Sequence, residues 1–142
     1  IYIGYPEAAF WYSNTNYLLS CILHQVTGCT LLQFLRENLF EPMDMEGCAW
    51  ETCPRGETMG ATGLYIATRD MAKLGVLYLH NGMWKGKRLL SAEWTAQAIC
   101  RQTPYAAYGF VFLGWANGAH QQTVTVLSKE NIVLAAHAFA DE

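Results

Sequence analysis

The sequence predicts an α+β fold, in which helices come first along the chain and an antiparallel sheet comes last. Apolar residues recur at helical spacing up to about residue 101, and beyond it the spacing changes to the alternation typical of strands. Because the two kinds of element are separated along the chain, a parallel βαβ arrangement is not expected. We therefore interpret residues 1–142 as a segment of one domain, mostly helical over 1–101 and built of antiparallel strands over 102–142.

The first helix is predicted to begin at Asn14 or Thr15, either of which can cap it, and to run to about Val26. Gly28 follows closely and is expected to end the helix as a left-handed cap. One face of this helix carries an apolar stripe, which is the pattern of a helix that packs against a core. The stripe consists of Tyr17, Leu18, Cys21, Ile22 and Val26.

A second helix is predicted to begin at its cap Thr30, with leucines on its inward face, and to stop at Pro42. Residues 44–63, which follow, are rich in glycine, cysteine and charged residues and are predicted to be an irregular connection. Long ordered connections in compact domains tend to be functional. Gly60 and Gly63 within it either let the backbone approach something closely or make a simple turn.

Two further helices are predicted, capped by Thr68 and by Ser91, with a small hairpin between them that turns at Lys85 and Gly86. Gly82 is expected to end the earlier helix. Asp70 and Lys73 lie three residues apart on that helix and are expected to form an ordinary surface pair.

Three strands are predicted after the helices, over residues 108–115, 122–127 and 131–139. The last two are joined by only three residues, which is short enough for an antiparallel hairpin. His137 alternates with apolar residues in the last strand and is interpreted as a hydrogen-bonded structural histidine.

Composition excludes several classes of function. The net charge of −3 provides no basic surface, so nucleic acid is not an expected partner. No apolar run approaches the length of a membrane span. The five cysteines are an odd and scattered set, which argues against a disulfide framework. Cys48 and Cys53, separated by four residues, leave a metal clip or a local disulfide open, but no second pair or nearby histidine supports a metal site.

Tyr12 and Asn14 offer the clearest chemistry in the sequence. In an extended segment, residues two apart point the same way, so a phenol and a carboxamide are expected side by side in front of the first helix. A phenol can relay a proton for a nucleophile, and a carboxamide can recognise an amide. The bland alternative is a packed aromatic ring and a helix cap.

These residues are part of an ordered set of motifs. Residues 12–17 (YSNTNY), 26–28 (VTG) and 39–43 (LFEPM) resemble the serine β-lactamase and penicillin-binding-protein superfamily, and most closely its class C β-lactamase and esterase branch. Residues 60–65, 70–75 and 90–94 are similar to helical and connecting parts of that branch. The resemblance implies a β-lactamase/transpeptidase-like fold, with a helical region against an antiparallel sheet and the active site between them.

Members of this superfamily carry a Ser-x-x-Lys motif, a Tyr-x-Asn motif and a Lys/His-Thr-Gly-type strand motif. The resemblance implies that Tyr12 relays the proton of the nucleophilic serine and that Asn14 hydrogen-bonds the substrate amide. The third motif falls at residues 118–122, where Ala119 replaces the usual cation and Gln121 the usual glycine. His120 either compensates by lining the cleft or faces solvent, and the backbone N–H of Gln122 is expected to complete the oxyanion hole.

The Ser-x-x-Lys motif is absent from these residues, because none of the four serines is followed by a lysine three positions later. In the superfamily that motif precedes Tyr-x-Asn, so we expect a segment of a longer serine hydrolase. Its reaction would be acyl-enzyme chemistry on a β-lactam, peptide or ester, with no metal and no organic cofactor. The expected partners are a small-molecule or peptide substrate and the missing N-terminal part of the same protein.

Two alternatives remain open from the sequence. The chain is either from a non-catalytic relative that binds peptide or cell-wall fragments, with Ala119 and Gln121 marking loss of the site, or an independently folding fragment without activity. An upstream Ser-x-x-Lys favours the enzyme. Any export signal would precede Ile1, so the compartment stays open.

Overall fold

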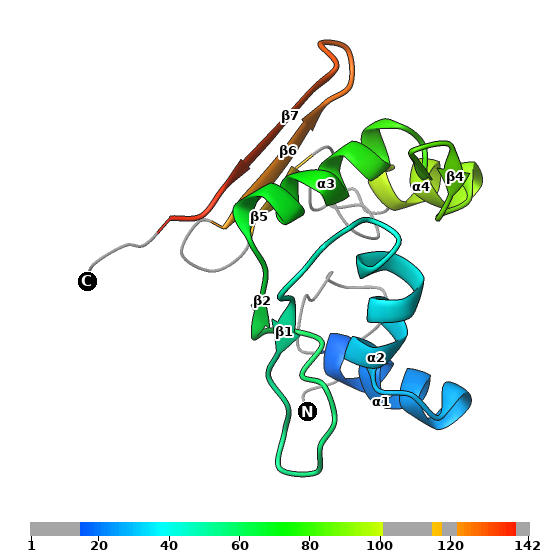
Figure 1. Cartoon of the computed structure of the whole chain (residues 1–142), viewed down its shortest axis with the longest axis vertical. Coiled ribbons are helices and arrows are strands. Elements are labelled where there is room, and N and C mark those ends of the chain that lie inside the picture. The colour runs from blue at the N-terminus through cyan, green and yellow to red at the C-terminus, as the bar shows by residue number, and fades with distance from the viewer. Residues whose placement is uncertain (1–14, 101–114, 118–121, 139–142) are drawn as a thin grey trace, which may run out of the picture. The chain divides into compact units, whose positions relative to one another are not determined.

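The chain has an α+β fold, described here by a computed structural model for residues 15–100, 115–117 and 122–138 (Figure 1). The described residues form two compact units, 15–67 and 68–138. The first unit is mainly helical with one short pair of strands, whereas the second combines two helices with two antiparallel sheets. Most of the predicted strand over residues 108–115 lies outside the described residues.

In the first unit, helix α1 (Thr15–Thr27) is followed by α2 (Leu31–Leu35), which continues as a π-helical segment (Arg36–Phe40). Two short strands, β1 (Ala49–Trp50) and β2 (Leu64–Tyr65), then pair antiparallel. These strands pair the two ends of the connection that was predicted to be irregular. Inside it, Thr52 and Thr58 form one further antiparallel bridge. The connection is thus more ordered than its composition indicates.

The predicted helix boundaries in this unit are confirmed. Gly28 has a φ of 74°, and its N–H donates to the carbonyl of His24 at 2.8 Å, as expected of a left-handed cap. The Thr30 side chain accepts from the backbone N–H of Gln33, while the Gln33 side chain accepts from the N–H of Thr30. This reciprocal capping box satisfies two N–H groups that the first turn of α2 would otherwise leave unpaired.

The apolar stripe predicted on α1 is only partly buried: Tyr17 and Cys21 are half-buried, whereas the other three residues are exposed. Leu18 is 49% exposed, Ile22 57% and Val26 80%, whereas Ser20 is only 1% exposed. The inward side of α1 therefore includes polar groups, and Ser20 donates a 2.7 Å hydrogen bond to the carbonyl of Thr58. The spacing of apolar residues does not predict this hydrogen bond between α1 and the connection.

In the second unit, helix α3 (Thr68–Leu79) is followed by the hairpin of β3 (Met83–Trp84) and β4 (Lys87–Arg88) and by helix α4 (Ala92–Ile99). Strands β5 (Trp115–Asn117), β6 (Thr123–Leu127) and β7 (Ile132–Ala136) form an antiparallel sheet in the order β5-β6-β7. The predicted hairpin of the last two strands is confirmed, with Val126 opposite Val133.

Helix α3 packs on β6 and β7, which confirms the predicted packing of a helix on the late strands (Figure 1). Val124 and Val126 are buried on this side of β6. Gly75 of α3 lies directly against the sheet, because a Cβ built at this position would be 2.5 Å from a methyl carbon of Val133 and 2.9 Å from one of Val124. Since these distances are far below van der Waals contact, the absence of a side chain at Gly75 permits the close packing.

The predicted turn at Lys85 and Gly86 and the predicted cap at Ser91 are also confirmed, whereas Thr68 is the first residue of α3 and its hydroxyl pairs with the Nδ1 of His137 at 3.0 Å. Lys85 and Gly86 both have positive φ, 45° and 82°, as a two-residue hairpin turn requires. The Ser91 side chain accepts from the N–H of Trp94 at 3.0 Å and caps α4. Gly82 lies just beyond the end of α3 and has a φ of 83°. Its N–H donates to the carbonyl of Leu77, inside the helix, at 2.8 Å.

The Asp70–Lys73 pair is not the surface pair that its spacing predicts. Asp70 is 1% exposed, and the Nζ of Lys73 lies 2.7 Å from its Oδ1. The carboxylate lies in the first turn of α3, where the helix dipole favours a negative charge. Helical spacing predicts the pairing correctly but carries no information about how deeply the pair lies.

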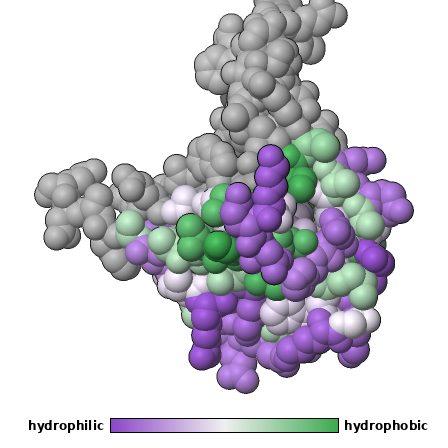
Figure 2. Space-filling model, turned by 90° about the horizontal axis from the view of Figure 1, so that it is seen from above, coloured by the Kyte–Doolittle hydropathy of each residue, from purple (hydrophilic) through white to green (hydrophobic). Residues whose placement is uncertain are grey.

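Large apolar side chains are exposed in both units, and Figure 2 shows hydrophobic side chains among hydrophilic ones on one face of the molecule. On the side of β7 that faces away from α3, Ile132 is 44% and Leu134 57% exposed. Within the described residues no single helix is long and apolar enough to cross a membrane. One bent pair, α1 with the helical run Leu31–Phe40 at 77°, passes that test by length and composition only.

Candidate active site

Three of the four residues predicted for the active site, Tyr12, Asn14 and His120, lie outside the described residues. Their roles therefore stay predictions. The chain places Tyr12 and Asn14 within three residues of Thr15, the first residue of α1. The structure therefore describes the helix that follows the Tyr-x-Asn motif and the segments that position that helix.

Gln122, the fourth predicted residue, precedes β6 and is half-buried. Its side-chain Nε2 donates a 2.7 Å hydrogen bond to the carbonyl of Ala138, just beyond β7. Asn117 of β5 lies opposite Thr123 of β6, so Gln122 stands where the chain passes from one paired strand to the next. The side chain thus ties the start of the central strand β6 to the chain beyond β7, and the role predicted for its backbone N–H remains a prediction.

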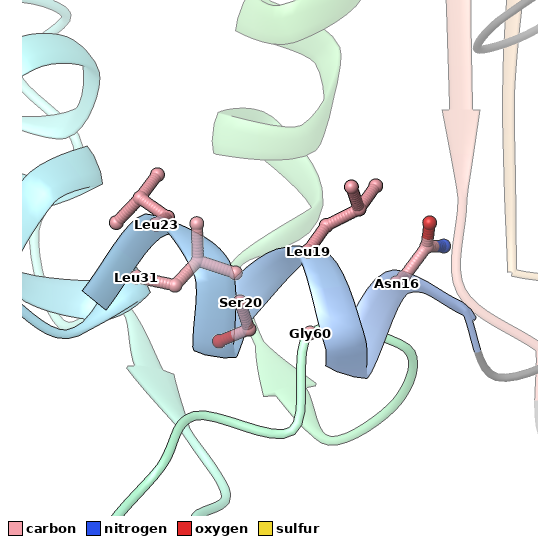
Figure 3. Close-up of a pocket in the computed structure, with 6 residues that line it drawn as sticks. All are labelled: Asn16, Leu19, Ser20, Leu23, Leu31 and Gly60. Carbon is pink, nitrogen blue, oxygen red and sulfur yellow. The ribbon is translucent and has the colours of Figure 1, made fainter. Parts of the chain in front are cut away.

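A cavity of about 230 Å³ adjoins the first turns of α1 (Figure 3). Asn16 is the lining residue nearest to the predicted motif, and the Gly60 backbone closes the cavity from the connection. Most of the remaining wall is aliphatic. It is formed by Leu19, Ser20, Leu23 and Leu31. A small apolar group would fit such a space, since polar groups are few in it.

Of the two interpretations left open for Gly60 and Gly63, the structure supports a close approach to other parts of the unit. Gly60 has a φ of 60°, and a Cβ there would lie 2.6 Å from the carbonyl oxygen of Asn16. Gly63 has a φ of 77°, and a Cβ there would lie 2.7 Å from the carboxylate of Glu51. Both glycines therefore approach other parts of their own unit, and Gly60 in particular holds the connection against α1.

Two ionisable pairs join α1 to the same connection. The Nδ1 of His24 lies 2.9 and 2.8 Å from the two carboxylate oxygens of Glu57. Two turns earlier on α1, the Tyr17 hydroxyl donates to the Sγ of Cys53 at 3.4 Å. Together with the bond from Ser20 to Thr58, these contacts fix successive turns of α1 to residues 53–58.

The Tyr17–Cys53 contact shifts the ionisation of both groups. The thiol of Cys53, and then that of Cys21, raises the pKa of Tyr17 by accepting its hydroxyl proton. The Tyr17 hydroxyl lowers the pKa of Cys53, with help from the backbone N–H groups of Arg55 and Glu57. The sulfur of Cys53 is therefore the favoured place for negative charge in this cluster.

A second cavity, of about 210 Å³, lies beside this cluster. We call it the Cys53 pocket, and it is lined by Tyr17, Cys53, Met59, Ala61 and Thr62. No group of three or more histidine, cysteine or acidic residues within the described ranges is placed to hold a metal ion. None of the five cysteines, all of which fall in described ranges, forms a disulfide.

Sequence reasoning missed this polar face of α1. Tyr17 and Cys21 were assigned to an apolar stripe, and His24 was explained by its place near the end of the helix. The available signal was the spacing of Tyr17, Ser20 and His24, which places three polar side chains on one side of the helix. Their partners could not be found, because residues 53–58 are distant in sequence.

Comparison with solved structures shows that the fold is β-lactamase-like. Among 34 matching chains is a Bacillus anthracis protein named as a candidate 6-aminohexanoate-dimer hydrolase, which aligns with a TM-score of 0.76 at 24% identity. The alignment covers 94% of this chain and 39% of that one, so this chain spans well under half of that protein's length. A likeness at this identity shows the fold alone.

The family follows from the sequence itself. The family model described as Beta-lactamase matches residues 4–136, and the chain therefore belongs to the β-lactamase family. No curated protein matches the chain significantly. The family match extends across both compact units and across the residues of all predicted site motifs in the chain.

Proposed function

We propose that the protein containing this chain is a serine hydrolase that works through an acyl-enzyme, and that this chain supplies its Tyr-x-Asn element. The observation that carries the proposal is the family match over residues 4–136, within which Tyr12 and Asn14 directly precede α1. A hydrolase-type function is what the family and its fold neighbour have in common. The nucleophile and the substrate are parts of the proposal.

In this proposal Tyr12 accepts the proton of the nucleophilic serine and returns it to the leaving group. Serine attacks an acyl carbon efficiently only when a neighbouring base takes its proton. Asn14 donates to the carbonyl of the substrate's acyl side, which orients the scissile bond. The contacts of Ser20 and His24 with the connection hold α1, the helix that follows this motif in the chain.

The proposal assigns the oxyanion side of the site to Gln122. Its backbone N–H would donate to the oxygen that becomes negative in the tetrahedral intermediate. The hydrogen bond of the Gln122 side chain to Ala138 supports this assignment, because it restrains the residue at the start of β6. His120 would take the place of the cation that Ala119 does not provide.

The proposed substrate class is an amide or ester rather than a β-lactam in particular. The name of the Bacillus anthracis neighbour refers to a dimer of 6-aminohexanoate, which contains a linear amide. Ala119 and Gln121 replace the residues that, by family resemblance, help to bind a substrate carboxylate. We therefore expect open-chain amides and esters to react better than penicillins.

The test is the substitution Tyr12→Phe in the complete protein, assayed with a chromogenic ester. Removal of a positioned proton carrier should lower kcat/KM by on the order of 10²-fold or more while the circular dichroism spectrum stays the same. Tyr65→Phe is the matched control, because Tyr65 is another phenol, 60% exposed and bonded to Glu51 on β1–β2. If both variants retain full activity, Tyr12 has no catalytic role.

A non-catalytic binding protein is the second candidate, and the same two replacements, Ala119 and Gln121, favour it. Serine hydrolysis requires a Ser-x-x-Lys motif upstream of Tyr12, whereas a binding protein does not. The complete protein should then bind a peptide or cell-wall fragment measurably in calorimetry while hydrolysing no ester. Ester turnover that is lost with Tyr12→Phe would reject this candidate.

A further inference from the structure

Two thiols and a phenol meet beside the Cys53 pocket, and the proposed function assigns a role to none of the three. The Tyr17 hydroxyl lies 3.4 Å from the Cys53 sulfur and also contacts the thiol of Cys21, one turn further along α1. Cys53 and Tyr17 both line the pocket of about 210 Å³, together with Met59, Ala61 and Thr62. This arrangement places a sulfur atom next to a space of small-molecule size.

The loop that carries Cys53 is held in a fixed conformation. The Cys53 N–H donates to the Glu57 carbonyl at 2.9 Å, and the Gly56 N–H donates to the Cys53 carbonyl at 2.8 Å. Gly56 has a φ of 82°, which glycine adopts without strain. The Tyr17 hydroxyl donates to the Cys53 sulfur at 3.4 Å, and the backbone of Arg55 and Glu57 in this turn also lowers the pKa of Cys53.

Cys53 rather than Cys21 is the reactive thiol of the pair. A phenol has one proton and can donate it to one sulfur at a time. Cys53, unlike Cys21, lines the pocket, and the Tyr17 hydroxyl with the backbone of Arg55 and Glu57 lowers its pKa, which favours the thiolate, the nucleophilic form of cysteine. The Glu57 carboxylate opposes this charge, but it is itself paired with His24 at 2.8 Å.

We propose that Cys53 is a thiol-exchange site, at which a small neutral disulfide enters the Cys53 pocket and forms a mixed disulfide with the Cys53 sulfur. In this step the Cys53 thiolate attacks one sulfur of the disulfide, a new S–S bond forms, and the original S–S bond breaks. The other half leaves as a thiolate, so the disulfide is reduced and Cys53 is oxidised. The Tyr17 hydroxyl keeps its proton and acts as a donor throughout. The walls formed by Met59, Ala61 and Thr62 carry no charge, which is why a neutral disulfide is the class that fits.

The test uses 4,4′-dithiodipyridine, a small neutral disulfide, in less than one equivalent on the complete protein. Tryptic peptides are then sequenced by mass spectrometry. Cys48 and Cys53 fall in the same tryptic peptide, residues 37–55, so fragment ions assign the label between them. We expect the first label on Cys53. A first label on Cys48, Cys21 or another cysteine would overturn the proposal.

The pH dependence of labelling tests the role of Tyr17. Loss of a donor raises the thiol pKa, and each pKa unit lowers the thiolate fraction tenfold while raising its intrinsic reactivity by about threefold. Tyr17→Phe should therefore slow labelling of Cys53 at pH 7, by about threefold for each unit by which its pKa rises, and move its pH profile upward. The matched control Tyr65→Phe removes a phenol bonded to Glu51 instead and should change neither. An unchanged profile in Tyr17→Phe contradicts the proposal.

A second measurement needs no variant and keeps the proposal testable if Tyr17→Phe does not fold. The labelling profile of Cys53 in the native wild-type protein is compared with that of the same residue in urea. The native midpoint should lie at lower pH, because the Tyr17 hydroxyl and the turn around Cys53 lower its pKa only in the folded unit. Coincident midpoints would show that the fold does not activate this thiol.

Discussion

Substitution of Gly75 by alanine tests how closely α3 packs on the β6–β7 hairpin. Two effects of opposite sign compete. Alanine is favoured over glycine inside a helix by about 1 kcal/mol, which alone would stabilise the protein. The new Cβ, however, would lie 2.5 Å from a methyl carbon of Val133 and 2.9 Å from one of Val124.

The overlap decides the sign of the net effect. Carbon atoms in contact are about 3.5–4.0 Å apart, so the helix and the hairpin would have to separate by roughly 1 Å. Both neighbours are valines, whose branched side chains have little rotamer freedom to move aside. Overpacking of this kind costs about 1–3 kcal/mol, and the contact with two stiff side chains points to the upper part of that range. We expect Gly75→Ala to lower the free energy of unfolding by about 1–2 kcal/mol.

Urea unfolding followed by circular dichroism measures this change, with two further variants as controls. Ala72→Gly reports the alanine–glycine difference at a neighbouring position of α3. The double variant Gly75→Ala/Val133→Ala lacks the methyl groups that lie nearest to the new Cβ. Its loss of unfolding free energy should be about 1–2 kcal/mol smaller than the sum of the two single losses. If Gly75→Ala stabilises the protein, or if the two substitutions are additive, the packing described for α3 is wrong.

Two other changes have defined outcomes. Ser20→Ala should lower the free energy of unfolding by about 1–3 kcal/mol, because it leaves the carbonyl of the fully buried Thr58 without its 2.7 Å hydrogen-bond donor. The control Ser128→Ala, in the exposed turn, should have no effect in the same urea titration. Burial raises the pKa of Tyr78 in the folded protein above its unfolded value of about 10, although a hydrogen bond from Trp94 opposes this. The stability that this pKa shift contributes is fully present below about pH 10 and is lost as the pH rises through the folded pKa. In Tyr78→Phe the free energy of unfolding should therefore fall less steeply above about pH 10. An equally steep fall in the variant would refute this role of Tyr78.

The sequence predicts the elements of this fold well where the signal is local. The caps at Thr30 and Ser91 and the left-handed glycine at Gly28 depend on residues within three or four positions, and all three are confirmed. The β6–β7 hairpin is likewise a local feature, since a short turn joins two alternating strands. The family resemblance, which depends on several motifs in order, is confirmed by the match over residues 4–136.

Features that depend on distant partners are where prediction fails. The buried face of α1 is polar because Ser20 and His24 meet Thr58 and Glu57, more than thirty residues away. No periodicity within α1 identifies these partners. Asp70 is deeply buried although its spacing from Lys73 is that of a surface pair, since burial depends on what packs against α3. The thiol cluster of Tyr17 and Cys53 was missed for the same reason.

Of the predicted site residues, only Gln122 can be placed, and its side chain bonds to Ala138. Its predicted use of a backbone N–H came from motif order, which does not specify side-chain contacts. The assignments of Tyr12, Asn14 and His120 depend on resemblance alone and await functional tests.

The central claim, that the protein is a serine hydrolase, is tested most directly by the intact mass of the complete protein after treatment with a fluorophosphonate. We predict a single covalent adduct on a serine upstream of Tyr12, and slower or absent labelling by a penicillin under the same conditions. An adduct that forms in the wild type and is strongly slowed by Tyr12→Phe would agree with a proton-relaying phenol. No adduct on the folded complete protein would contradict the acyl-enzyme proposal and would favour the binding protein instead.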